Sequence, residues 1–273
     1  MVLTQLFDKG NGERSIGFLG AGTNHLYAGE QAGTTYISKL RVTCCNVAHD
    51  SAKLFAMRDE KYRDFHARLI PNVPREKIIG VRTPRLRSYA KELFRSGRAE
   101  QFMQMELPYF YYEEMNLRAF LIEQIADFQR AAEEAERLMI HADNWATCDS
   151  MKPKIFAKNH PELIKCVEKW LKSEHTYVVR YGLVCLLTYF LDDDFNPHYC
   201  ELAAAVPSGE YYIDMANAWF FSMALAKNYD EAVKYISERR LSVFVHNAAI
   251  QKAVESRQVP PETKKYLKTL KIK

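Results

Sequence analysis

Two long apolar segments in the second half of the chain constrain its fold more than any other feature of the sequence. They read TYVVRYGLVCLLTYFL, residues 176–191, and YYIDMANAWFFSMALA, residues 211–226. Each is long enough for a helix of four turns or more and is apolar on most sides, which is typical of a helix buried in the centre of a protein. The second half therefore predicts a helical core that other helices must cover.

The rest of the chain from Ser51 onward also has the character of successive helices. The segment ELIKCVEKWLKS, residues 162–173, carries apolar residues at helical spacing, and most prolines fall at apparent junctions. Thr83 before Pro84 predicts a helix start, and Asp143 is placed to cap the helix that carries Trp145. We expect roughly ten to twelve helices of ordinary length.

These helices predict an all-α fold over residues 51–273. Short connections between helices favour a bundle or a superhelical solenoid of antiparallel helix pairs, of the HEAT or armadillo kind. The sequence contains no crisp repeat, so the solenoid is inferred from the spacing of the helices alone.

Residues 1–50 differ in composition from the remainder. Seven of the eleven glycines lie within the first 33 residues, which predicts a poorly structured extension, with a short strand possible over residues 34–42. The motif GFLGAG, residues 17–22, is similar to a nucleotide-binding loop. It lacks a convincing strand before it, and we interpret it as part of a flexible segment.

Composition excludes several classes of protein. The chain is 48% hydrophobic and 26% charged, as in ordinary globular proteins, and no apolar run approaches the roughly 18 residues of a membrane span. The first residues do not resemble a signal peptide, so we expect a soluble protein of the cytoplasm, or of the nucleus in a eukaryote. No zinc-binding spacing occurs, so we expect no metal site, and we expect buried or free thiols at Cys44, Cys45, Cys148, Cys166, Cys185 and Cys200.

The densest group of reactive side chains is DNWATCDS, residues 143–150. In a helix Trp145 and Asp149 share one face, and a ring beside a carboxylate suits a cationic ligand. The alternative is that Trp145 belongs to the core and Asp149 caps a helix. Arg180 lies within an apolar helix and needs a partner, either Asp149 or a phosphate. Trp219 lies in another core-like helix, where simple packing also explains it.

The stretch from Lys61 to about Lys271 resembles the DNA alkylation repair family, the HEAT-like-repeat alkylpurine DNA glycosylases. The resemblance is carried, in order, by KYRDFHARLIP, IIGVRTPRLR, DNWATCDSMKPKIF, YVVRYGLVCLLTYFLDDDF, YYIDMANAWFFSMALA and HNAAIQKAVESR. The aromatic and acidic pair of the family falls on Trp145 and Asp149, its arginine on Arg180 and its second aromatic residue on Trp219. Residues 1–50 have no counterpart in this resemblance.

The resemblance implies hydrolysis of the bond between an N3- or N7-alkylated purine and deoxyribose in duplex DNA. The alkylated base is a good leaving group, so Asp149 would stabilise the oxocarbenium-like sugar and position water. Trp145 and Trp219 would pack against the sugar, and Arg180 would hold a phosphate or orient Asp149. A monofunctional enzyme is implied, with no cofactor and no deep pocket for the base.

The resemblance also implies a concave face that holds duplex DNA, although the net charge of only +4 indicates this weakly. Candidate contacts are Arg82, Arg85, Arg87, Lys152, Lys154, Arg180, His246 and Lys252, with Lys264, Lys265, Lys268, Lys271 and Lys273 as a second group. Each residue alone fits an ordinary surface charge better than a DNA contact, and His246 fits a structural histidine. The alternatives to a monomeric enzyme are a non-catalytic DNA-binding scaffold and a HEAT-like protein-interaction module.

Overall fold

The computed structural model describes residues 50–273, and this part of the chain is built of helices without a strand. Residues 50–56 are helical. The elements that follow are α2 (Glu60–Leu69), η1 (Arg75–Lys77), α3 (Thr83–Arg95), α4 (Ala99–Met103), α5 (Tyr112–Ile122), α6 (Phe128–Ile140), α7 (Trp145–Ser150), η2 (Phe156–Lys158), α8 (His160–Trp170), α9 (Thr176–Tyr189), α10 (His198–Ala204), α11 (Tyr211–Lys227), α12 (Tyr229–Ser237), α13 (Val243–Glu255) and α14 (Pro261–Thr269).

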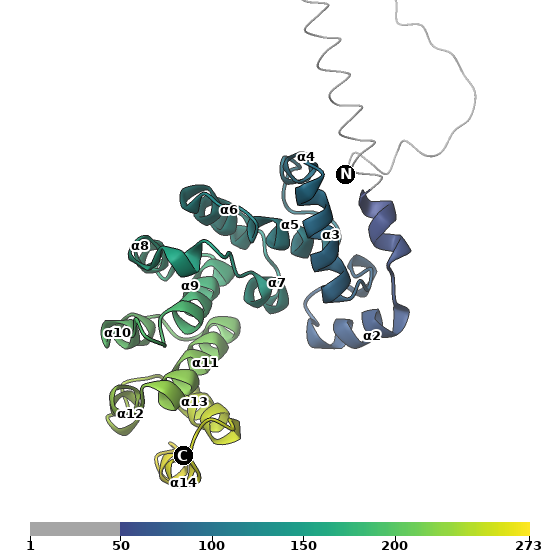
Figure 1. Cartoon of the computed structure of the whole chain (residues 1–273). Helices are drawn as coiled ribbons and strands as arrows, with labels where there is room; N and C mark the ends of the chain where they lie inside the picture. The colour runs from purple at the N-terminus through teal and green to yellow at the C-terminus, as the bar shows by residue number, and fades with distance from the viewer. Residues whose placement is uncertain (1–49) are drawn as a thin grey trace, which may run out of the picture. The chain divides into compact units, whose positions relative to one another are not determined.

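The helices from α5 onward alternate between two layers. Figure 1 shows α6, α8, α10 and α12 following one another along one side, with α9, α11 and α13 along the other. Helix α11 packs against both α9 and α13, and α8 packs against α9. The packing is that of stacked helix pairs, as a solenoid requires.

The sequence explains which helices occupy each layer. All of α5 and most of α9 are buried, and α11 is buried on most sides. The residues of α9 and α11 are mostly apolar around the helix, whereas α5 also buries charged side chains such as Glu113. Helices α6, α8 and α12 instead bury a single stripe and turn charged residues toward solvent. The all-helical prediction is therefore confirmed, as is the central position of residues 176–191 and 211–226.

Two details of the helix prediction were wrong. Residues 50–273 contain fourteen helices rather than ten to twelve, because a helix as short as α4, with five residues, shows no periodic pattern. Thr83 is not the N-cap of α3: that position is Arg82, without a side-chain cap, and Pro84 lies in the first turn. The predictions for residues 1–49, including the extension, the strand and the glycine motif, lie outside the described residues.

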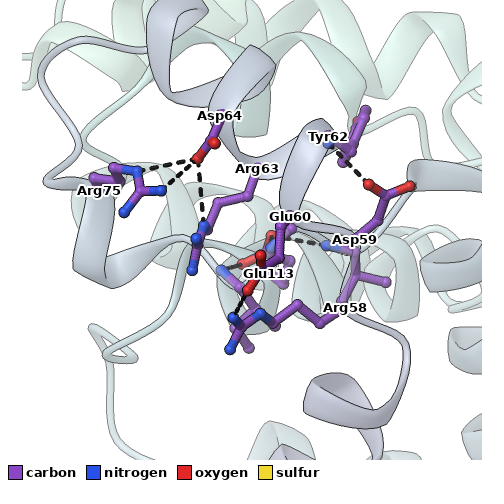
Figure 2. A network of polar contacts seen from close by, with 11 residues as sticks. Arg58, Asp59, Glu60, Tyr62, Arg63, Asp64, Arg75 and Glu113 are labelled. Carbon is purple, nitrogen blue, oxygen red and sulfur yellow. Dashed lines mark hydrogen bonds and ion pairs between the residues drawn. The ribbon is translucent and has the colours of Figure 1, made fainter.

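A buried carboxylate fixes the segment before α3 onto α5. Glu113 accepts hydrogen bonds from the backbone N–H groups of Ile79, Gly80 and Val81, at 2.9, 2.6 and 3.1 Å. Burial raises the pKa of Glu113, although these N–H groups oppose the shift. Gly80 has φ +96°, and a Cβ there would lie 2.5 Å from the carbonyl oxygen of Asp59. Asp59 begins α2, so this polar network seats α2 beside α5 (Figure 2).

Within residues 50–273, no helix has both the length and the apolar character that crossing a bilayer demands.

Candidate active site

The short helix α7 is fixed at its first residue by the side chain of Asn144. The Oδ1 atom of Asn144 accepts a hydrogen bond from the N–H of Thr147 at 2.9 Å, and Asn144 is buried. Asn144, and not Asp143, is thus the N-cap, which corrects the prediction. Asp143 instead accepts a hydrogen bond from the Asn144 side-chain amide at 2.8 Å.

Trp145 is half-buried at the start of α7 and anchors this helix to the end of α2. Its indole N–H donates to the carbonyl oxygen of Leu69 at 3.0 Å. Its ring packs on a small apolar cluster that contains Ile70, Val73, Ile78 and Tyr112. The hydrogen bond and the packing together orient the ring, so Trp145 is neither a free surface residue nor a fully buried one.

Asp149 lies one turn after Trp145 and forms a two-point ion pair with Arg180 of α9. The Nε and Nη2 atoms of Arg180 donate to the two carboxylate oxygens of Asp149 at 2.8 and 2.7 Å. The side chains are only 7% and 13% exposed for Arg180 and Asp149 respectively. Of the two partners predicted for Arg180, the structure supplies the carboxylate.

A third hydrogen bond ties this pair to α11. Nη1 of Arg180 donates to the carbonyl oxygen of Tyr212 at 2.6 Å. Burial alone would lower the pKa of Arg180, but the hydrogen bonds and charge of Asp149 outweigh burial, and the pKa is raised. Arg180 therefore remains charged and joins α7, α9 and α11 through one side chain.

Trp219 is half-buried on α11, between the fully buried Ala218 and Phe220. It follows Tyr212 by seven residues, which places it on nearly the same side of α11, about 10 Å further along the helix. Within residues 50–273 no hydrogen bond or ring contact joins Trp219 to Trp145 or Asp149. The structure thus brings Trp145, Asp149 and Arg180 together, with Trp219 on a neighbouring helix.

This arrangement combines a carboxylate with an aromatic ring at a partly open position. Both groups stabilise positive charge, the carboxylate through its full charge and the ring through its π face. No group of three or more His, Cys, Asp or Glu residues in the described part of the chain could hold a metal ion.

The family model for a DNA alkylation repair enzyme matches residues 51–257, about three quarters of the chain. The chain belongs to this family. The match includes every helix from α2 to α13, and with them Trp145, Asp149, Arg180 and Trp219. A search of curated proteins found no match.

The basic residues considered for DNA contact in this family member are placed in different ways. Arg82 is exposed but pairs with Asp59, its Nε donating at 2.9 Å; Figure 2 shows the same carboxylate beside Tyr62. Arg85, Lys152 and Lys154 are exposed, and Lys252 is half-buried on α13. The second group of lysines lies on or after α14, and Lys271 donates to Gln251.

Besides Arg180, two residues predicted to reach DNA make contacts within the protein. His246 has no exposed surface, and its Nε2 atom lies 2.9 Å from the carbonyl oxygen of Leu270. A phosphate cannot reach this side chain, so His246 is a structural histidine, which was the alternative prediction. Arg87 is half-buried and pairs with Glu123, and it also donates to the carbonyl oxygen of Ser150 at 2.8 Å.

Cys148, next to Asp149, is a fully buried free thiol, and Cys166, Cys185 and Cys200 are also free. Burial first, and then the charge of Asp149, raise the pKa of Cys148 well above its usual value. The thiol therefore stays protonated and is inert beside the site. Cys44 and Cys45 lie outside the described residues.

The sequence did not indicate three groups that build this site: the side chain of Asn144 and the carbonyl oxygens of Leu69 and Tyr212. Asn144 had a usable signal, because asparagine is as good an N-cap as the adjacent Asp143. The two carbonyl groups leave no trace in the sequence, since every residue carries one.

Proposed function

We propose that this protein is a monofunctional DNA glycosylase that hydrolyses the N-glycosidic bond of N3- or N7-alkylated purines in duplex DNA. The observation that carries the proposal is Asp149, fixed by Arg180 at two points and sharing one face of α7 with Trp145. Membership of the DNA alkylation repair enzyme family supplies the reaction class.

In the proposed reaction the bond between C1′ and the purine nitrogen breaks, and its electron pair leaves with the base. That pair neutralises the positive charge of the alkylated ring, so the base departs without a strong acid. The charge on the sugar is opposed by Asp149, and Trp145 and Trp219 pack against the sugar. Water then forms the new bond to C1′, and its proton passes to solvent through the carboxylate.

Asp149 retains capacity for this role although Arg180 occupies both of its oxygens. Each carboxylate oxygen accepts one N–H from Arg180, which leaves a second lone-pair position on each oxygen for water. The Asp149 side chain is 13% exposed, so it is not sealed from solvent. Arg180 thus orients the carboxylate without closing it.

Duplex DNA is the proposed partner of a monomeric protein, bound on a concave face that includes the site. Exposed Arg85, Lys152 and Lys154 are the proposed phosphate contacts, and Lys152 follows Asp149 by three residues. Phosphate contacts of this kind position the duplex, and they make the affinity dependent on salt.

The test is release of base from duplex DNA that contains 7-methylguanine or 3-methyladenine, measured in single turnover. We expect release by the wild type and a loss of about 100-fold or more for Asp149→Asn, as for removal of one strong electrostatic stabiliser. Asp193→Asn, which removes an exposed carboxylate, is the matched control and should retain the full rate.

Two results would overturn the proposal. A folded Asp149→Asn protein with an unchanged rate would remove Asp149 from the reaction. A wild type that binds the damaged duplex but releases no base would favour the non-catalytic DNA-binding scaffold.

A further inference from the structure

The chain directly after Asp149 is held by two side chains from other helices. Arg87 of α3 donates from Nη2 to the carbonyl oxygen of Ser150 at 2.8 Å. Glu123, the C-cap of α5, accepts a hydrogen bond from the N–H of Lys152 through Oε1 at 2.9 Å. We name Arg87 and Glu123 the α7 clamp.

The two members of the α7 clamp also bind each other. Nη1 of Arg87 donates to Oε2 of Glu123, whose side chain is only 8% exposed. The guanidinium of Arg87 lies 3.9 Å from the ring centroid of Phe120, on the same helix as Glu123. Glu123 thus uses one oxygen for Arg87 and the other for the backbone, so its buried charge is fully engaged.

Helix α7 depends on contacts of this kind because it has only six residues. A helix so short has few internal hydrogen bonds, and the last carbonyl groups of any helix lack partners within it. Arg87 supplies a partner to Ser150, the last residue of α7, with a positive charge that suits a helix C-terminus. Asn144 fixes the opposite end, so Asp149 lies between two fixed points.

We propose that Arg87 and Glu123 are positioning residues that set the location of Asp149 for catalysis. The inference rests on the proposed glycosylase function. Neither residue touches the DNA in this role: they act through the backbone of Ser150 and Lys152. Displacement of a catalytic group by about 1 Å can cost about 100-fold in rate, so a weakened clamp reduces the chemical step.

The role differs measurably from a phosphate contact, which the sequence suggested for Arg87. Loss of a phosphate contact weakens DNA binding and reduces its salt dependence. Loss of a positioning contact lowers the single-turnover rate at saturating enzyme and leaves the dissociation constant for DNA unchanged.

The experiment compares Arg87→Met with Arg95→Met, which removes an exposed guanidinium from the same helix. We expect Arg87→Met to lower the single-turnover rate about tenfold or more, with the dissociation constant within about twofold of wild type, and Arg95→Met to change neither. Arg87→Lys keeps the charge beside Glu123 but lacks the two-armed guanidinium, so it should recover only part of the rate.

Glu123→Gln tests the other member and serves also if Arg87→Met fails to fold. The amide oxygen can still accept one hydrogen bond, so the fold should survive while the rate falls. A clamp variant that folds and keeps the wild-type rate would overturn the proposal. A variant whose main defect is weaker DNA binding, seen as a larger dissociation constant, would overturn it too.

A second readout does not need turnover. The protein is labelled with 5-fluorotryptophan, and the ¹⁹F line of Trp145 is assigned with Trp145→Phe among the three tryptophans. We expect that line to shift or broaden in Arg87→Met and to stay unchanged in Arg95→Met. Absence of base release by the wild type would contradict the glycosylase proposal, whereas an unchanged Trp145 line would contradict the clamp.

Discussion

Helices α7 and α11 each carry a tryptophan of the candidate site, and they are held in place by different forces. Helix α11 has seventeen residues, and its buried residues include Ala216, Ala218, Phe220 and Phe221. Helix α7 has six residues, of which only Thr147 and Cys148 are buried. Burial of apolar surface stabilises α11, whereas α7 depends on hydrogen bonds from side chains of other elements.

This difference separates the contacts that determine the stability of the domain from those that determine the geometry of the site. Apolar packing is spread over many side chains and stabilises the whole domain, so damage to it lowers the free energy of unfolding. The polar contacts of α7 are few and directional, so the loss of one moves a short segment while the domain remains folded. Substitutions near α7 should therefore affect rate more than stability, and substitutions inside α11 should do the reverse.

The largest effect is expected where the two regions meet, at Arg180. Arg180→Met removes three hydrogen bonds and leaves Asp149 without its ion-pair partner. Breaking a buried pair in this way costs about 3–5 kcal/mol, and both the free energy of unfolding and the base-release rate should fall. Urea unfolding and single-turnover assays measure the two losses. Arg257→Met, at an exposed arginine, is the control, and equal stability of the two variants would contradict the structural role of Arg180.

A substitution inside α11 should lower stability alone. Phe221 is fully buried and its ring centroid lies 5.3 Å from that of Tyr235 on α12. Phe221→Ala leaves a cavity and should cost about 3–5 kcal/mol of unfolding free energy. The release rate per folded molecule should stay within about twofold of wild type. A rate that falls as far as in Asp149→Asn would show that the apolar packing of α11 also determines the geometry of the site.

The same contrast explains which parts could be predicted from the sequence. The apolar composition of residues 176–191 and 211–226 indicates that they are buried, so their helices and central position were predicted correctly. The pairing of Arg180 with Asp149 was one of two predicted alternatives, since a buried charge requires a partner but does not specify one.

The α7 clamp could not be predicted, because its contacts join residues far apart in the chain. Arg87 lies 36 residues from Glu123 and 63 residues from Ser150. An arginine on a helix surface looks the same in a sequence whether it binds a phosphate or a backbone carbonyl group. The choice between Asn144 and Asp143 as the cap of α7 likewise depends on which side chain turns inward.

A smaller effect on stability is expected at Asn144. Asn144→Ala removes the cap of α7 and should cost about 1 kcal/mol of unfolding free energy, with a loss of rate of about tenfold because Asp149 moves. Ser242→Ala is the matched control: Ser242 caps α13 in the same way, accepting from the N–H of Val245 at 3.3 Å. It should lower stability by a similar amount without lowering the rate. Equal rates in the two variants would mean that the position of α7 does not depend on its cap.

The smallest expected effect is a pH dependence of the free energy of unfolding, which arises near Trp145 of α7. His66 of α2 is buried, its Nε2 atom lies 2.7 Å from the hydroxyl of Tyr112, and Tyr112 belongs to the cluster under Trp145. Burial raises the pKa of Tyr112, so its hydroxyl stays protonated and shares a hydrogen bond with His66.

Burial lowers the pKa of His66 below its usual 6.5, so between these two values the unfolded chain binds a proton that the folded protein does not. The stability is therefore fully present above pH 6.5 and falls below it, by at most about 1.4 kcal/mol per pH unit. The free energy of urea unfolding, measured from pH 7.5 to 5, should show this slope in excess of that of His66→Gln. Parallel curves for the two proteins would mean that His66 titrates alike in the folded and unfolded states, and that the support of Trp145 is insensitive to pH.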